Sequence, residues 1–384
     1  MNQKLEADLR YKRIIYKPNN PDPNRQAIVF TGGIHGNEPA GYTALESVLS
    51  NLEQSGISLQ GDVYAFGGNL KAMEANKRFL TIDLNRLWTK KLVHQFKTGE
   101  ISSSVWGEEI EEFAELLSEI EHILQFYHNK VIFIDLHTTS SKSVPFIPIN
   151  DTLSNRSLAL NFPVPTVLGI EEFIDGPLLS YINEVGHVAL GIEAGQHEDP
   201  RSADIHASFI RLCLHFTRTA IVPASRVQQD LAALKAACPT LNGIYEIWYR
   251  YAIQPNEKFR MTPGYSSFSE VHAGQELAVS EGKRIFADRA TRVFMPLYQE
   301  QGEDGYYLIR KVSKRWLLLS AWLRKSRIEV LFAALPGVHR TAPDTLVINR
   351  YIARFMSKEI SHLFGYRIQS STQSHLLITK RDLD

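Results

Sequence analysis

This chain has few cysteines, no long apolar segment and no net charge. Its two cysteines, Cys213 and Cys238, lie in apolar, helix-like surroundings and lack a C-x-x-C spacing. Such cysteines are more typical of reduced residues in a protein core than of a disulfide framework. We therefore expect a cytoplasmic protein.

The apolar runs are also too short for a membrane span. Residues 316–322 come nearest, but they fall far below the ~18 apolar residues that a span needs and are followed by Arg324 and Lys325. The first 17 residues mix charges of both signs and lack the apolar core of a signal peptide. Because 42 basic residues balance 42 acidic ones, no overall field favours nucleic acid or an anionic membrane. We expect a soluble protein that recognises any acidic substrate through locally placed arginines.

A chain of 384 residues exceeds what one hydrophobic core usually supports, so we expect two domains. Residues 1–237 alternate predicted strands and helices, which is typical of an α/β sheet flanked by helices. Residues 238–384 are predicted to form a mainly-β domain, since short strands and turn signals predominate at its start. From about residue 311 helical spacing returns, and segments 316–327 and 346–364 are predicted as a helical extension.

The most informative stretch is a glycine-rich turn between a predicted strand and a predicted helix. The apolar residues 27–31 are followed by Gly-Gly-Ile-His-Gly-Asn-Glu at positions 32–38. His35 and Glu38 are three residues apart, so their side chains can converge on one point at the start of the helix. This stretch therefore suggests two ligands of a single metal ion.

Two further strand ends carry matching residues. His137 ends the continuous apolar strand predicted at 131–137, and Glu193 lies near the end of the strand predicted at 188–194. Two imidazoles and one carboxylate form a three-ligand site for zinc, and Glu193 is then the free carboxylate that can act as a base. Asp135 lies on the same strand face as His137 and could hold its second ring nitrogen, as could a backbone carbonyl.

The loop of residues 78–86 offers groups that bind an acidic substrate. Arginine binds carboxylates through two parallel hydrogen bonds, and asparagine adds a neutral donor. Arg86 with Asn85 could therefore hold a substrate carboxylate, while Arg78 could stabilise an oxyanion beside the metal.

Purely structural interpretations exist for each motif alone. A lone H-x-x-E is common, with His35 as a loop histidine and Glu38 as a first-turn carboxylate favoured by the helix dipole. Glu193 alone could be an ordinary strand-end carboxylate, and residues 83–86 could form a turn with an internal ion pair. The co-occurrence of suitable residues on four separate loops favours a mononuclear zinc hydrolase.

Four segments together resemble a known family. They are Gly32-Gly33-Ile34-His35-Gly36-Asn37-Glu38, Asp83-Leu84-Asn85-Arg86, Asp135-Leu136-His137-Thr138-Thr139 and Gly191-Ile192-Glu193-Ala194-Gly195. Their order and spacing resemble those of the succinylglutamate desuccinylase/aspartoacylase family, relatives of the zinc carboxypeptidases, over roughly residues 25–310. The resemblance implies a zinc-carboxypeptidase-like domain with a mixed sheet flanked by helices, and a mainly-β domain that helps to cover the site. It also implies one Zn²⁺ per chain and hydrolysis of the amide bond of a small N-acyl amino acid.

The resemblance also assigns roles to individual residues. It implies His35, Glu38 and His137 as metal ligands and Glu193 as general base and acid. It implies Asn85 and Arg86 as the substrate-carboxylate clamp and Arg78 as the group that polarises the scissile carbonyl. A tyrosine of the second domain, Tyr306 or its neighbour Tyr307, is expected to reach the substrate; Tyr306 is our choice.

One position departs from the family pattern. Aspartoacylases have an arginine about ten residues before the catalytic glutamate, where this chain has Asn183. The acyl group and the amine of the substrate therefore stay open. A homo-oligomeric state is also possible. The alternatives are a metallocarboxypeptidase acting on peptides and a catalytically inactive zinc-containing binding protein.

Overall fold

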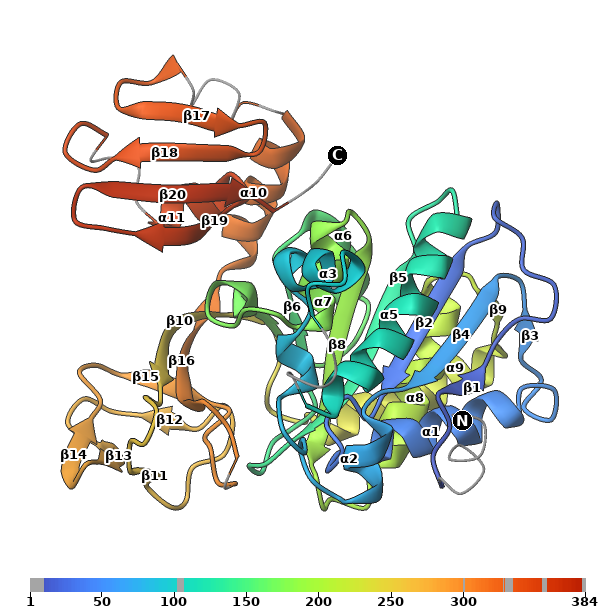
Figure 1. Ribbon diagram of the computed structural model, residues 1–384. Helices are drawn as coiled ribbons and strands as arrows, with labels where there is room; N and C mark the ends of the chain where they lie inside the picture. Colours follow the sequence, from blue (N-terminus) through green and yellow to red (C-terminus); the bar gives the residue numbers. More distant parts are fainter. Residues whose placement is uncertain are drawn as a thin grey trace.

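A computed structural model describes residues 10–101, 107–299, 301–326, 328, 334–353 and 358–381. Its central sheet has five strands in the order β1-β4-β2-β5-β8 (Figure 1). The strands are β1 (Ile14–Tyr16), β2 (Ala27–Gly32), β4 (Asp62–Gly67), β5 (Ile132–Thr139) and β8 (Val188–Gln196). All are parallel except β1, which pairs antiparallel with β4. The strands predicted from apolar runs are confirmed, and their carboxyl ends lie at one edge of the sheet.

Each face of this sheet has its own hydrophobic core, because successive side chains of a strand point to opposite faces. In β2, Ile28 and Phe30 pack into one core, and Ala27 and Val29 pack into the other. Helices α1 (Ala40–Ser50), α8 (Ser202–Phe216) and α9 (Ala224–Ala237) contribute to the first core, and α5 (Glu109–Phe126) and α7 (Leu178–Glu184) to the second. Helix α5 is predicted to begin at residue 103; residues 102–106 lie outside the described ranges.

Shorter elements complete the first half of the chain. They are β3 (Ser58–Leu59), α2 (Leu70–Glu74), η3 (Leu84–Arg86), α3 (Lys90–Lys97), β6 (Ile147–Ile149), α6 (Leu153–Ala159), β7 (Thr166–Leu168), η4 (Ile170–Glu172) and β9 (Ala220–Ile221). The last of these pairs with β3 in a two-stranded sheet.

The second large sheet runs across the predicted domain boundary at residue 237. Its order is β12-β15-β16-β10-β7-β6, so β7 from the first part of the chain pairs in parallel with β10. The new strands are β10 (Ile244–Ala252), β12 (Glu270–Val271), β15 (Thr291–Phe294) and β16 (Asp304–Val312). A three-stranded sheet of β11 (Phe259–Met261), β13 (Glu276–Ser280) and β14 (Lys283–Phe286) lies beside it. The described elements between Ile244 and Val312 are all strands, while the division into domains stays a prediction.

The C-terminal part is not the helical extension predicted from the sequence. Helix α10 (Lys314–Ser326) agrees with the predicted helix, whose last residue, Arg327, lies outside the described ranges. The helix predicted over 346–364 is wrong at its start, where strand β18 (Thr345–Asn349) lies, and agrees with the structure near its end, where the short helix α11 (Lys358–Leu363) lies. Leu346 and Ile348 are buried on alternate positions, and apolar runs this short do not distinguish helix from strand.

Four antiparallel strands form the sheet of this C-terminal part, which Figure 1 shows as a separate layer at the end of the chain. Their order is β17-β18-β20-β19, with β17 (Val338–Ala342), β19 (Tyr366–Ser371) and β20 (His375–Lys380). The sheet packs its own small core of apolar side chains. The sequence also predicts a last strand near residues 374–379, and β20 confirms it.

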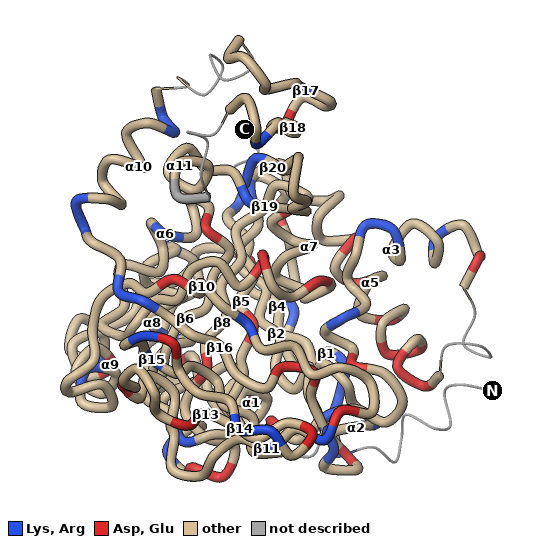
Figure 2. The backbone as a smooth tube through the Cα atoms, turned by 90° about the vertical axis from the view of Figure 1, so that its left-hand side faces the viewer, with Lys and Arg blue, Asp and Glu red and all other residues tan. Residues whose placement is uncertain are grey.

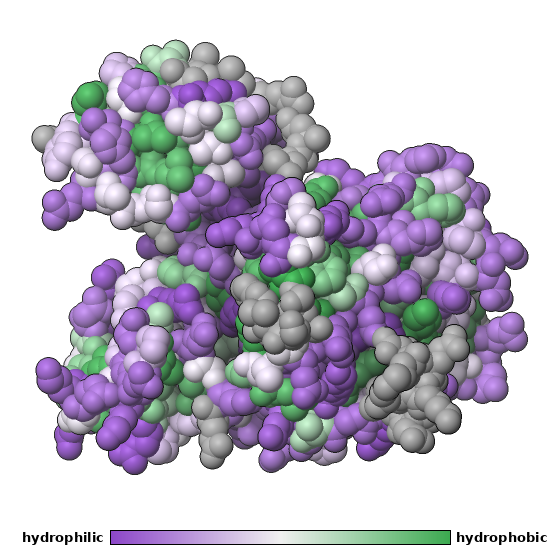
Figure 3. All heavy atoms as spheres, in the orientation of Figure 1, coloured by the Kyte–Doolittle hydropathy of each residue, from purple (hydrophilic) through white to green (hydrophobic). Residues whose placement is uncertain are grey.

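The surface shows no single dominant sign of charge. Basic and acidic residues are both spread over the chain in Figure 2, and the face seen in Figure 3 is mostly hydrophilic. In the described part of the chain, no helix is both long enough and apolar enough to cross a bilayer.

A buried ion cluster joins the C-terminal part to the central domain. Asp151 accepts hydrogen bonds from Arg156 of α6, from Arg324 of α10 (2.8 Å) and from Arg381 (3.0 Å). Burial alone would raise the pKa of the Asp151 carboxyl, but the three guanidinium groups hold it far below its ordinary value. A charge this well compensated is stable only while all its partners are present.

We predict that Asp151→Asn lowers the free energy of unfolding by about 3–5 kcal/mol, because it removes the negative charge that the buried Arg156, Arg324 and Arg381 share. The control is Asp288→Asn, whose exposed pair with Arg289 should contribute less than about 1 kcal/mol. Urea unfolding measures both variants. Folding lowers the pKa of Asp151, so its contribution to the free energy of unfolding is complete above about pH 4 and declines as the pH falls further. The decrease in unfolding free energy caused by Asp151→Asn should therefore be smaller in acid. An equal effect of both substitutions at pH 7 would contradict the prediction.

Candidate metal centre and catalytic site

The turn between β2 and α1 brings His35 and Glu38 to the end of the sheet. Gly33 has φ +78°, which side chains other than glycine rarely adopt. Gly36 packs so closely on α2 that a Cβ atom would lie 2.1 Å from the carbonyl carbon of Ala72. The two glycines therefore allow the turn to pack closely against α2, and the side chains of His35 and Glu38 lie in the buried cluster with His137.

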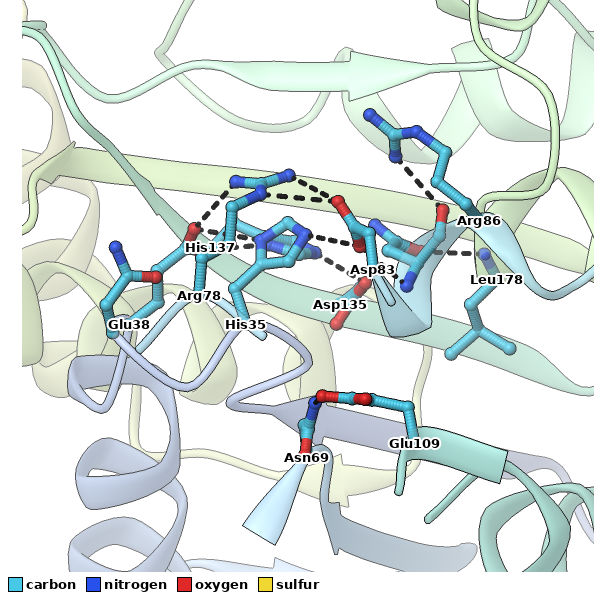
Figure 4. Close-up of polar contacts among 12 residues, drawn as sticks. His35, Glu38, Asn69, Arg78, Asp83, Arg86, Glu109, Asp135, His137 and Leu178 are labelled. Carbon is cyan, nitrogen blue, oxygen red and sulfur yellow. Dashed lines mark hydrogen bonds and ion pairs between the residues drawn. The ribbon is translucent and has the colours of Figure 1, made fainter. Parts of the chain in front are cut away.

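His35, Glu38 and His137 form one compact cluster. The Nδ1 atom of His35 lies 2.8 Å from Glu38 Oε1, and Nδ1 of His137 lies 3.0 Å from Glu38 Oε2. One ligand atom from each residue lies within 4.8 Å of the others, and all three residues are buried. The structure thus brings together the three residues that the sequence analysis selected as metal ligands (Figure 4).

Asp135 holds the other side of the His137 ring. Its Oδ2 lies 2.6 Å from His137 Nε2, and its Oδ1 accepts a hydrogen bond from Thr31 Oγ1 at 2.6 Å. The prediction that Asp135 holds the second ring nitrogen is confirmed. This contact fixes the ring so that Nδ1 faces Glu38.

The cluster is electrostatically coupled. Burial alone would raise the pKa of Glu38, but the two histidines hold it well below its ordinary value. Burial alone would lower the pKa of His137, but Asp135 and Glu38 raise it well above its ordinary value. The two carboxylates therefore favour a positive charge at His137, either a proton or a cation.

Glu193 lies next to His137 in the register between β5 and β8. Its side chain is 7% exposed, and its Oε2 atom has no hydrogen-bond partner within the described ranges. Burial and the nearby Glu38 raise its pKa well above the ordinary value, although His137 and Arg78 oppose the shift. An unpaired carboxyl with a raised pKa is the arrangement expected of a group that accepts and returns a proton.

The loop of residues 78–86 is fixed by a buried carboxylate at the start of α5. Glu109 accepts hydrogen bonds from the backbone N–H groups of Leu80, Thr81 and Ile82 and from the Asn69 side chain. Figure 4 shows Glu109 and Asn69 facing each other below the cluster. These bonds hold the loop over the strand ends.

Asp83 connects the loop to the cluster. Its Oδ2 accepts from Arg78 Nη2 at 3.0 Å, and its Oδ1 lies 3.3 Å from His35 Nε2. Burial alone would raise the pKa of Asp83, but His35 and Arg78 hold it well below its ordinary value. The ion pair expected from the purely structural interpretation exists, and it also orients a candidate ligand and a candidate catalytic arginine.

Arg78 reaches the cluster itself, with Nη1 3.8 Å from Glu38 Oε1. Asn85 accepts a hydrogen bond from the Leu178 N–H through Oδ1 (2.9 Å), which leaves its amide nitrogen for other partners. The guanidinium of Arg86 donates to the Asn85 carbonyl and lies 3.5 Å from Asp304 Oδ2 of β16. In Figure 4, Arg86 lies on the far side of Asp83 from Glu38.

These groups line one cavity of about 600 Å³. It is lined by all the predicted site residues except Tyr306. Tyr306 instead stacks on Tyr251, with ring centroids 5.4 Å apart, inside a core of the region from β10 to β16, which we call the second region. The choice of Tyr306 is therefore corrected to Tyr307, which lines the cavity. Adjacent residues of a strand point to opposite faces, so the sequence alone could not decide between them.

Asn183, the position that departs from the family pattern, does not reach the cavity. Its side chain bonds Asn155 and the carbonyl of His187 on the buried side of α7. Sequence reasoning missed several residues that line the cavity, among them His197 and Asp304. His197 closely follows the end of β8, and the strand-end argument that selected Glu193 applies to it as well.

The donor set of the cluster fits a divalent cation. Among the residues that the structure describes, four buried or nearly buried carboxylates belong to the cluster or lie close to it, and Arg78 is the guanidinium near them; the carboxylates are Glu38, Asp83, Asp135 and Glu193. A cation held by two imidazoles and Glu38 would offset this negative charge. Zinc prefers imidazole nitrogen and carboxylate oxygen in such sites.

Comparison with known proteins agrees with this site. A family model described as the succinylglutamate desuccinylase/aspartoacylase catalytic domain matches residues 24–220. The chain belongs to this family. The matched range contains every candidate metal ligand, Glu193 and the loop of residues 78–86.

Curated members of the succinylglutamate desuccinylase/aspartoacylase family match over shorter stretches. A succinylglutamate desuccinylase of Photorhabdus laumondii is 37% identical over 67 residues, 17% of this chain and 21% of that protein. One of Serratia proteamaculans is 32% identical over 119 residues, 31% of this chain and 34% of that protein. The chain thus spans about a fifth to a third of these relatives.

Solved structures of the family share the fold. A succinylglutamate desuccinylase of Vibrio parahaemolyticus has a TM-score of 0.52 and 16% identity, covering 77% of this chain and 85% of that one. A family member of Rhodobacter sphaeroides has a TM-score of 0.53 and 17% identity, covering 76% and 87%. The mixed α/β fold is thereby confirmed, while its zinc-carboxypeptidase-like arrangement stays a prediction.

We predict that Asp135→Ala weakens zinc binding by about 10- to 100-fold, because the His137 ring loses the contact that fixes its orientation. Competition with a chromophoric chelator measures the affinity. Asp288→Ala, an exposed aspartate outside the cavity, is the matched control and should bind zinc as the parent does. Equal affinities of the two variants would count against a zinc site at His137.

Proposed function

We propose that the protein is a zinc-dependent hydrolase that cleaves the amide bond of an N-acyl amino acid or a similar small amide. The observation that carries this proposal is the unpaired Glu193 carboxyl beside the His35–Glu38–His137 cluster, at the wall of the cavity of about 600 Å³. Family membership supports the same reaction class.

His35, Glu38 and His137 would hold the metal. When bound there, zinc would lower the pKa of a water molecule and polarise the substrate carbonyl. Glu193 accepts the proton that the water loses as its oxygen bonds to the amide carbon. It then donates this proton to the nitrogen as the carbon–nitrogen bond breaks, giving a carboxylate and a free amine.

Two other groups would act on the substrate. The guanidinium of Arg78 is held by Asp83 and stabilises the negative charge that develops on the carbonyl oxygen. Arg86, with the amide nitrogen of Asn85, binds a substrate carboxylate and orients the scissile bond. Tyr307 contributes its ring to the wall of the same cavity.

A metallocarboxypeptidase is the alternative within hydrolases. Trimming of peptides needs an open cleft, whereas this cavity is also lined by second-region residues such as Leu297, Asp304 and Tyr307. This wall favours a small substrate. Release of C-terminal residues from unmodified peptides at a higher rate than from N-acyl amino acids would support the alternative.

We predict that Glu193→Gln lowers kcat by about 10²- to 10⁴-fold while zinc stays bound, because the variant lacks the proton acceptor but keeps all three ligands. His35→Ala should instead lose stoichiometric zinc. Turnover of a panel of N-acetyl and N-succinyl amino acids, together with metal analysis, measures both variants.

The same experiment tests the remaining alternative, an inactive binding protein. Such a protein would bind these compounds equally well with Gln at position 193 and would have no turnover to lose. An Asp288→Asn control, outside the cavity, should keep the parent's turnover. Parent protein that holds no zinc, together with unchanged metal content in His35→Ala, would refute the proposed function.

A further inference from the structure

The second region contributes charge of its own to the cavity. Asp304, at the start of β16, lines the cavity together with its neighbour Glu303. The Asp304 carboxylate lies 3.5 Å from Arg86 through Oδ2 and accepts a hydrogen bond from Arg250 Nε through Oδ1. Arg250 in turn donates to the carbonyl of Phe173, in the loop after η4. Asp304 is therefore fixed from two sides while it faces the substrate space.

The cavity has little positive charge left for the substrate. Among the described residues that line it, Arg78 and Arg86 are the only lysines or arginines. Arg78 is paired with Asp83 and lies close to Glu38. Arg86 is thus the one cation placed to hold a substrate carboxylate, and it already shares its charge with Asp304.

A second substrate carboxylate would find no such partner at this end of the cavity. It would meet the carboxylates of Asp304 and Glu303, and contact between like charges in a partly buried site costs enough to lower affinity about tenfold or more. The neutral lining offers hydrogen bonds and apolar contact instead. These lining residues include Ser140, Asn150, Ile174, Ser180, Met295 and Leu297.

We propose that the site selects N-acyl amino acids with a single carboxylate and that Asp304 is the residue that excludes a second one. This inference rests on the proposed function and narrows its substrate class. The single carboxylate binds Arg86, and the remainder of the substrate is uncharged. Arg250 is a positioning residue, because it holds Asp304 and does not line the cavity.

Isosteric pairs that differ only in carboxylate against carboxamide provide the test. One pair varies the amine part, N-acetyl-L-glutamine against N-acetyl-L-glutamate. The other varies the acyl part, N-succinamoyl-L-alanine against N-succinyl-L-alanine. For the zinc-loaded full chain we expect that, in at least one pair, kcat/KM is about tenfold or more higher for the carboxamide member than for the carboxylate member.

Asp304→Asn should reduce this preference to about threefold or less, mainly by raising kcat/KM for the dicarboxylate member. Asp304→Glu keeps the charge and should keep the preference. Asp288→Asn removes an exposed charge of the same region and should change neither member. If Asp304 only oriented Arg86, Asp304→Asn would weaken both members equally and the preference would persist, which would overturn the inference.

Binding separates a failure of this inference from a failure of the proposed function. Calorimetry on zinc-loaded Glu193→Gln gives Kd for the same four compounds without turnover. If the parent hydrolyses none of the compounds, the proposed function fails, and the Kd ratios still decide the selectivity. Equal or tighter binding of the dicarboxylate member in both pairs would overturn the inference, as would absence of binding by all four. These Kd ratios, measured with Asp304 intact, test the selectivity for a single carboxylate even if Asp304→Asn does not fold.

Discussion

The site depends on the balance of buried charge around two imidazoles. Its carboxylates are Glu38, Asp83, Asp135 and Glu193, and Arg78 is the one guanidinium among them. Ionised carboxylates are stable in a protein interior only when cations or hydrogen bonds compensate them. Asp83 and Asp135 are compensated by Arg78, Thr31 and the ring nitrogens that face away from Glu38. Under the proposed function, the two remaining carboxylates have different roles: Glu38 helps to bind the cation, and Glu193 transfers the proton.

The sequence could bring these residues together in one candidate site because parallel strands place their carboxyl ends at one edge of a sheet. Continuous apolar runs identify such strands, so His35, His137 and Glu193 could be assigned to a common site without knowledge of the sheet order. Local spacing then sufficed for Glu38 and Asp135. His197 obeys the same rule, but it lies beyond the signature segments and its role becomes visible only where its ring lines the cavity.

Other features depend on contacts that sequence periodicity does not carry. Tyr306 and Tyr307 alternate across β16, and only the packing of Tyr306 on Tyr251 determines which of them faces the cavity. Asp304 pairs with Arg86, which lies 218 residues earlier in the chain, and no local sequence pattern predicts such a contact. The start of the helix predicted over 346–364 was wrong for a related reason, since β18 is identified as a strand by its partners β17 and β20 rather than by its own five residues.

The wall of the cavity also depends on the C-terminal part of the chain. Asp151 follows two cavity-lining residues, Ile149 and Asn150, and its N–H donates to Glu171 of η4. The side chains of Asp151 and Glu171 also contact Arg381, beyond β20. One arginine therefore joins two segments of the wall, while Arg250 joins the next residue after η4 to Asp304. Arg381 makes its connection through ion pairs, and Arg250 makes its own through an ion pair with Asp304 and a hydrogen bond to the Phe173 carbonyl. Residues more than a hundred positions from the candidate metal ligands therefore hold segments of the cavity wall, and we expect changes in the C-terminal part to alter selectivity more than chemistry.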